Sequence, residues 1–198
     1  MAHSNFSYSV DSLRTLTSYL WLVLLAVWLV GAFTVKNTVV KQSSKARVWY
    51  LFILGLGAYL IFNKRIDAPW LNLVPFHVDT SVAFAGFIVA CVGVVFAVWA
   101  RMTLGTNWSG AVTIKQDHTL IQAGPYRIVR HPIYTGLLIA LIGSAMQYGY
   151  LRSLVGVLLA GFGFWLKSLF EEQYMTQRFG DRYLIYRQRV RALVPFIF

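Results

Sequence analysis

Residues 120–136 bring Gly, Pro, Tyr, Arg and His together immediately before a long apolar run. Within this stretch, Pro132 favours the first turn of a helix, where its missing N–H would have no partner in any case. The first N–H groups of such a helix attract anions, as does the positive end of its dipole, and Arg130 and His131 lie beside them. The stretch therefore predicts a site for a carboxylate or a phosphate. The alternative is that Arg130 only extends to lipid headgroups.

Two adjacent acids, Glu171 and Glu172, form a second polar cluster in a chain that has only seven acidic residues. They follow the apolar run 153–170 directly. If the runs 133–151 and 153–170 form an antiparallel hairpin, the two acids return to residues 120–136. Acids near a membrane are usually paired or functional. We expect one acid to bind ribose hydroxyls or an ammonium group of a ligand and the other to pair with an arginine. The alternative is a salt bridge that closes the hairpin.

The segment after the acids, 171–198, is polar and rich in arginine. We expect Gly180 to end one helix and Asp181 to cap the next. One face of that next helix is apolar and contains Tyr183, Tyr186, Val190 and Leu193. The tail helix either lies on anionic lipid or closes the site, with Tyr183, Tyr186 or Arg187 reaching into it.

A third polar segment, 104–109, follows an earlier apolar run directly. Asn107 and Trp108 either line a pocket between spans or form a helix stop with an interfacial tryptophan. No metal-ligand spacing connects the four histidines, which are His3, His77, His118 and His131.

The elements that must position these residues are hydrophobic helices. The chain is 58% hydrophobic and 13% charged, whereas soluble domains have about 25% charged residues. Uncharged or nearly uncharged runs cover 16–35, 48–62, 81–100, 133–151 and 153–170. We expect an all-α, polytopic membrane protein of about five transmembrane helices with an amphipathic C-terminal tail. The third run carries small residues three and four apart, which favour close helix packing: Ala83, Gly86, Ala90, Gly93 and Ala97.

The formal net charge of +11 has a membrane explanation. Lysine and arginine collect in the cytosolic loops of membrane proteins. Most of the 18 lysines and arginines flank one side of the predicted spans, in 36–47, 101–132 and the tail. We expect these segments and the C-terminus to lie in the cytosol, and we expect membrane lipids, not nucleic acid, as the partners of the basic residues.

The quoted motifs resemble one enzyme family. Gly124-Pro125-Tyr126-Arg127, Arg130 to Gly136, Glu171-Glu172 and Phe179 to Tyr186 together resemble the isoprenylcysteine carboxyl methyltransferase family over residues 100–196. The chain resembles a compact prokaryotic-type member of the cytoplasmic membrane. The resemblance implies one domain, 1–198, in which 1–99 form N-terminal helices and 100–198 form the catalytic half. It also implies S-adenosylmethionine as the methyl donor and S-adenosylhomocysteine as the product.

The family's site residues carry over onto matching positions. The resemblance implies a cytosolic cofactor pocket between the last two spans, formed by Leu120, Gln122, Gly124, Tyr126, Arg130, His131, Pro132, Tyr134, Gly136, Glu171 and Glu172. We expect the acceptor to be bound by Trp108, Tyr183 and Tyr186 and oriented by Arg187 or Asn107. Eukaryotic members have a histidine shortly after the asparagine of this segment, whereas the chain reads Asn107-Trp108-Ser109-Gly110.

The leading hypothesis is methyl transfer to a lipophilic or lipidated carboxylate such as a prenylcysteine C-terminus. A carboxylate is already ionised at neutral pH and needs no general base. Three alternatives stay open: methylation of an amine, as in phospholipid N-methyltransferases; a membrane reductase that uses a nicotinamide cofactor; and a non-catalytic module in which the same residues form salt bridges.

Overall fold

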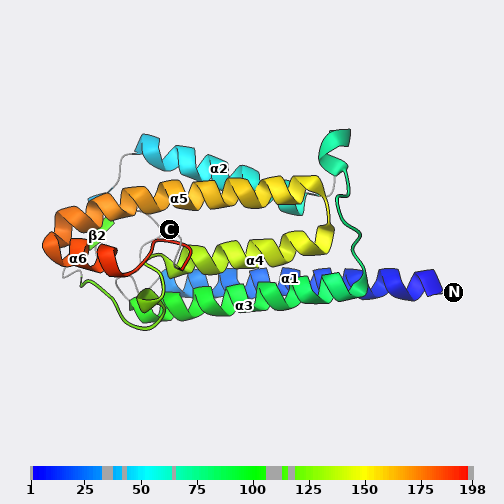
Figure 1. Cartoon of the computed structure of the whole chain (residues 1–198), viewed down its shortest axis with the longest axis horizontal. Helices are drawn as coiled ribbons and strands as arrows, with labels where there is room; N and C mark the ends of the chain where they lie inside the picture. The colour runs from blue at the N-terminus through cyan, green and yellow to red at the C-terminus, as the bar shows by residue number, and fades with distance from the viewer. Residues whose placement is uncertain are drawn as a thin grey trace.

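The computed structural model describes residues 2–32, 38–41, 44–63, 66–105, 113–115 and 119–195. Its long helices run side by side along one axis (Figure 1). They are α1 (Ala2–Ala32), α2 (Ser44–Phe62), α3 (Thr80–Leu104), α4 (Pro132–Tyr148) and α5 (Leu151–Phe179), followed by the short α6 (Asp181–Arg189). The predicted all-α class is confirmed. The sequence did not predict the small antiparallel sheet of β1 (Thr38–Lys41) and β2 (Thr113–Lys115).

Each of the five apolar runs forms a helix, and the chain is an integral membrane protein. Three helices are long and apolar enough to cross a membrane by length and composition, over Ser9–Gly31, Thr80–Leu104 and Leu151–Phe179. The apolar part of α2, Arg47–Phe62, and the whole of α4 are shorter.

Two helices extend beyond the predicted bounds. α1 begins well before residue 16, and α5 continues through Glu171 and Glu172 to Phe179. The residues after 170 include Glu, Gln and Arg, which are polar but favour helix as strongly as most apolar residues do. The helix ends only at Gly180, whose φ of 52° is accessible mainly to glycine. The two acids therefore lie inside α5, not in a separate tail.

The predicted cap of the last helix is wrong in one detail. Gly180 occupies the position before α6, and no side chain caps this helix end. Asp181 is instead the first helical residue, where its charge still favours the positive end of the helix dipole.

Small residues hold α3 against α4. The five residues of the predicted stripe, Ala83, Gly86, Ala90, Gly93 and Ala97, are all buried. A Cβ atom on Gly93 would lie 2.3 Å from the backbone nitrogen of Ala140 and 2.6 Å from the carbonyl oxygen of Gly136. The two backbones are therefore in direct contact, as the spacing of small residues predicted.

α4 and α5 form the predicted antiparallel hairpin, with Gly149 at φ 69° in the turn (Figure 1). Their main packing partners are nevertheless different, because α4 lies chiefly on α3 and α5 chiefly on α2. A Cβ atom on Gly156 of α5 would lie only 2.6 Å from the carbonyl oxygen of Gly57 in α2. Between α4 and α5, one contact is the stacked pair of Tyr134 and Phe164, whose ring centroids are 5.2 Å apart.

Candidate functional site

A set of charged side chains gathers where α4 begins and α5 ends, beside α6 (Figure 1). We call it the ionic cluster: Arg130, His131, Glu171, Glu172 and Arg187. Glu172 is at its centre, because Oε1 accepts from Arg130 Nε at 2.9 Å and from Nη2 at 2.5 Å. The Nε of Arg187 lies 3.2 Å from the other oxygen, Oε2. The structure thus brings both predicted polar clusters together, although they are about 40 residues apart in sequence.

The Arg130–Glu172 pair is shielded from solvent, whereas Arg187 is not. The side chains of Arg130 and Glu172 are 8% and 6% exposed, and that of Arg187 is 53% exposed. Breaking a buried pair by removing one partner leaves an uncompensated charge and destabilises strongly. Arg130 and Glu172 therefore form the fixed core of the cluster, and Arg187 is its reachable cation.

His131 lies between the two acids. Its Nδ1 is 3.3 Å from Glu171 Oε2, and its Nε2 is 3.3 Å from Glu172 Oε1. Burial by itself lowers the pKa of His131, but hydrogen bonds and charge interactions with Glu171 and Glu172 outweigh burial, and the pKa is raised above its ordinary value. Because both ring nitrogens face carboxylates, the protonated ring with two N–H donors fits this position.

Tyr134 completes the surroundings of Glu171. Its hydroxyl donates a hydrogen bond to Glu171 Oε1. Its ring stacks on His131 at a centroid distance of 5.6 Å and on Phe164 of α5 at 5.2 Å. Glu171 therefore has a hydrogen-bond donor from α4 and an ion-pair partner from the residue before α4.

The C-terminal segment 190–193, which we call the strap, lies along the start of α4. The backbone N–H of Arg130 donates to the carbonyl of Arg191 at 2.7 Å, and that of His131 donates to Ala192 at 3.0 Å. The strap carbonyls thus accept from the N–H groups of the two residues that precede α4, and the anion site expected at the first N–H groups of α4 itself stays a prediction.

Side-chain contacts fix the strap further. Thr135 Oγ1 donates to the carbonyl of Leu193 at 2.6 Å. The Nη1 of Arg130 donates to the carbonyl of Val190 and, at 3.2 Å, to that of Arg187. Arg130 therefore connects α5, α6 and the strap through a single guanidinium group.

α6 covers the cluster with its tyrosines. Tyr183 and Tyr186 are buried, and the Tyr186 hydroxyl donates to the backbone carbonyl of Tyr126 at 2.6 Å. Burial raises the pKa values of both α6 tyrosines, which favours the protonated hydroxyl in each. α6 thus lies on the 120–136 stretch, as expected for a closing element, with Arg182 and Arg189 exposed to solvent.

The remaining predicted residues divide by position. Leu120 is half-buried and Gln122 is exposed. Both precede a short 3₁₀ helix, Gly124–Arg127, whose first residue, Gly124, has φ 56°. Pro132 is the first residue of α4, as predicted. Gly136 lies in the α3–α4 interface, where a Cβ atom would be 2.6 Å from the backbone nitrogen of Ala97. Asn107 and Trp108 lie outside the described residues.

Sequence reasoning assigned no role to one cation beside the cluster. Lys167 lies on α5 one turn before Glu171, with Nζ 4.9 Å from the ring centroid of Tyr134 and 5.8 Å from that of Tyr50. The signal in the sequence was a lysine within an apolar run, four residues before an acid.

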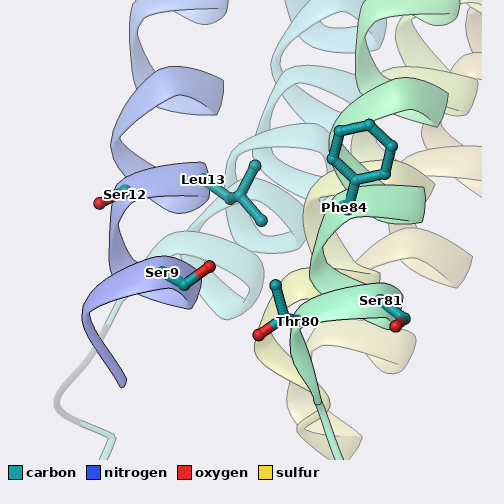
Figure 2. A pocket seen from close by; sticks show the side chains of 6 residues that line it. All are labelled: Ser9, Ser12, Leu13, Thr80, Ser81 and Phe84. Atoms are coloured by element: carbon teal, nitrogen blue, oxygen red, sulfur yellow. The ribbon is translucent and has the colours of Figure 1, made fainter. Parts of the chain in front are cut away.

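A cavity of about 670 Å³ opens at the other end of the bundle, between α1 and the start of α3 (Figure 2). It is lined by four hydroxyl residues and two large apolar ones: Ser9, Ser12, Thr80, Ser81, Leu13 and Phe84. None of the predicted site residues that the structure describes lines this cavity.

Known proteins share both the sequence pattern and the fold. The profile of the phospholipid methyltransferase family matches residues 82–182. A probable protein-S-isoprenylcysteine O-methyltransferase of Oryza sativa subsp. indica is 33% identical over 119 residues, 59% of this chain and 62% of that protein. The protein-S-isoprenylcysteine O-methyltransferase of Schizosaccharomyces pombe is 34% identical over 162 residues, 75% of this chain and 67% of that protein.

A solved structure of the eukaryotic intramembrane Ras methyltransferase, isoprenylcysteine carboxyl methyltransferase, has the same fold, with a TM-score of 0.53 and 24% identity. The match covers 80% of this chain and 55% of that structure. The chain spans less than two thirds of the rice relative's length. The identity to the fission-yeast protein, of which the chain covers 67%, nevertheless establishes that the chain belongs to the isoprenylcysteine carboxyl methyltransferase family.

Proposed function

We propose that the protein transfers a methyl group from S-adenosylmethionine to the carboxylate of a lipophilic acceptor, of which a prenylcysteine-type C-terminus is the best candidate. The observation that carries the proposal is the ionic cluster in a chain of this family. Charged groups of both signs meet at the end of membrane helices, where a polar cofactor and a lipid-soluble acceptor are both within reach.

The cluster fits the charges of the proposed methyl donor. The amino-acid end of S-adenosylmethionine is a zwitterion and requires both a cation and an anion close together. Arg187 offers an exposed cation, and Glu171, whose side chain is 20% exposed, offers an anion. We infer that Arg130 and Glu172 hold these groups in place and that the segment from Leu120 to Tyr126 binds the adenosine end with its backbone.

The role of the protein's own residues is then to hold the methyl donor and the acceptor in the correct relative position. The donor supplies an electrophilic methyl group, and an ionised carboxylate supplies the nucleophile, so no side chain has to remove a proton. Alignment of the two reactants and exclusion of water account for a large share of such a barrier. We propose that Tyr183 and Tyr186 of α6 close the site and that Asn107 helps to orient the acceptor, because the Arg187 cation is used by the amino-acid end of the cofactor. Trp108 belongs to the same acceptor-facing set.

We propose that the cluster faces the cytosol. Most lysines and arginines flank the bundle end that carries α6, which agrees with the positive-inside rule. The cofactor would then enter from the cytosol, and the apolar part of the acceptor would enter from the bilayer.

Calorimetry on detergent-purified protein with S-adenosylhomocysteine tests the site. We expect Glu172→Ala and Arg130→Ala to weaken binding more than tenfold, because each leaves a buried charge without its partner. Arg178→Ala is the matched control, since Arg178 is an exposed arginine near the end of the same helix α5. Wild-type affinity in both cluster variants would remove the proposed site.

A second candidate is methylation of a phospholipid amine, which the match to the phospholipid methyltransferase profile favours. An ammonium acceptor must lose a proton before or during transfer, and this step requires a base. Parallel assays with phosphatidylethanolamine, a farnesylcysteine and a fatty acid separate the two candidates by which acceptor gains the labelled methyl group.

A further inference from the structure

Lys167 places a cation on the membrane side of the ionic cluster. It precedes Glu171 by four residues on the same face of α5, which puts it about 6 Å farther into the bundle. Its ammonium lies near the rings of Tyr134 in α4 and Tyr50 in α2. Tyr134 connects it to the cluster, because the hydroxyl of that same tyrosine binds Glu171.

The two acids of the cluster are already engaged by other groups. Glu172 binds Arg130, Arg187 and His131. Glu171 binds His131 and receives the Tyr134 hydroxyl. Within the described ranges, no carboxylate forms an ion pair with Lys167.

The ionic cluster and Lys167 together carry more positive than negative charge, and one further anion would balance them. Arg130, Arg187 and Lys167 are three cations against the two acids, even when His131 is counted as neutral. A charged group in an apolar helix is unfavourable unless it meets an opposite charge or water. Aromatic rings attract an ammonium through their quadrupole but do not neutralise it.

We propose that the ammonium of Lys167 receives the carboxylate of the methyl acceptor. The inference rests on the proposed function and assigns the acceptor-binding residue of that site. Lys167 and Arg187 belong to different elements, because Lys167 lies on α5 one turn before Glu171 and Arg187 lies on α6. Arg187 is 53% exposed and faces solvent, whereas Lys167 lies between membrane helices, on the side from which a lipid-borne carboxylate arrives.

The reaction balances without any change at Lys167. One carboxylate oxygen contacts the ammonium, and the other attacks the methyl carbon of the sulfonium. The new C–O bond forms as the S–CH₃ bond breaks, and its electron pair stays on sulfur to give a neutral thioether. The resulting methyl ester has no charge, so its ion pair with Lys167 is lost and release of the product is favoured.

The same ammonium makes Lys167 a determinant of specificity. An acceptor that carries an ammonium group would be repelled by a like charge in this position. Lys167 therefore favours a carboxylate acceptor over a phospholipid amine, and over neutral analogues of the same shape.

Binding and kinetics of Lys167→Met and Lys167→Arg test the proposal. Methionine keeps an unbranched chain and removes the charge, and arginine keeps the charge. The probes are N-acetyl-S-farnesylcysteine and its neutral C-terminal amide, which differ only in the carboxylate. We expect Lys167→Met to raise KM for the carboxylate at least tenfold and to abolish the preference for the carboxylate over the amide in competition.

The KM of Lys167→Arg for the carboxylate should stay within about threefold of the wild-type value. Affinity for S-adenosylhomocysteine should change less than twofold in both.

The outcomes separate the two proposals. A Lys167→Met variant that keeps wild-type KM and still prefers the carboxylate overturns the role of Lys167, while methyl transfer by the wild type upholds the proposed function. Equal loss of carboxylate and amide binding would show a merely structural role and would also overturn it. If the wild type binds S-adenosylhomocysteine but methylates no carboxylate acceptor, both proposals fall.

Discussion

His131 is held by two carboxylates, and its protonation determines the charge of the cluster. With the ring protonated, each nitrogen donates toward one acid at 3.3 Å. With the ring neutral, one of these two contacts places a nitrogen lone pair against a carboxylate. Neither acid would then have a charged partner in His131, and one of the two would also lose its hydrogen bond to the ring. The histidine therefore couples the two acids to each other.

This coupling predicts a dependence of stability on pH. The pKa of His131 is raised above the unfolded value of about 6.5. A group whose pKa is higher in the folded state binds its proton more tightly there, so its contribution is complete below about pH 6.5 and is lost as the pH rises through the folded value. We expect thermal unfolding in detergent to show a gap in Tm between wild type and His131→Gln that narrows as the pH rises. A gap that is constant with pH would contradict the charged ring.

At the scale of residues, the sequence predicted contacts between charged side chains but not the hydrogen bonds that backbone groups form. The meeting of Arg130 and His131 with the two acids followed from their charges and from the hairpin. The strap carbonyls that accept hydrogen bonds from Arg130 and His131 had no signal in the sequence, because every residue has a carbonyl group. Lys167 was visible as a lysine, but the contacts of its ammonium depend on how α2 and α4 are placed around α5.

At the scale of elements, glycines set the distance between helices, and the α3–α4 contact is the clearest case. We expect Gly93→Ala to destabilise the protein by about 1–3 kcal/mol, because its Cβ would meet backbone atoms that cannot move independently of α4. Gly55→Ala is the matched control: Gly55 is also within a helix, α2, and its Cβ would meet nothing within 4 Å. Thermal unfolding in the same detergent measures both variants.

The control substitution Gly55→Ala should leave the stability of the protein unchanged or raise it slightly, because alanine has a higher helix propensity than glycine. If Gly93→Ala matched Gly55→Ala, the close approach of α3 and α4 would be refuted. Because α4 begins directly after His131, a displaced α4 would also weaken binding of S-adenosylhomocysteine, and Gly55→Ala would not.

Helix existence could be predicted from the apolar runs, but helix ends and partners could not. The apolar run ends at residue 170, but α5 continues to Phe179. The residues after 170 are less hydrophobic yet still favour helix, so hydrophobicity alone did not predict where α5 ends. The loop between α4 and α5 indicated that they are neighbours. It did not indicate that each would pack chiefly on another helix, which depends on small residues in α2 and α3 that are distant in sequence.

On the scale of the whole molecule, the two ends of the bundle differ in chemistry. One end carries the ionic cluster, α6 and the strap, with exposed arginines such as Arg182 and Arg189. The other end carries the open cavity between α1 and α3, whose lining has hydroxyl and apolar side chains but no charged ones (Figure 2). From the positive-inside rule we propose that the cluster end of the bundle faces the cytosol.

Cysteine labelling tests that orientation directly, because Cys91 is the only cysteine of the chain. In a Cys91→Ala background, Gln188→Cys places a thiol on the exposed face of α6, and Asp67→Cys places one in the exposed loop at the opposite end. We expect a membrane-impermeant maleimide to label Asp67→Cys in intact cells and Gln188→Cys only after the membrane is permeabilised. The reverse pattern would place the ionic cluster outside the cytosol. S-adenosylmethionine is made and kept inside cells, so the reverse pattern would also remove the cofactor from reach and contradict the proposed methyl transfer.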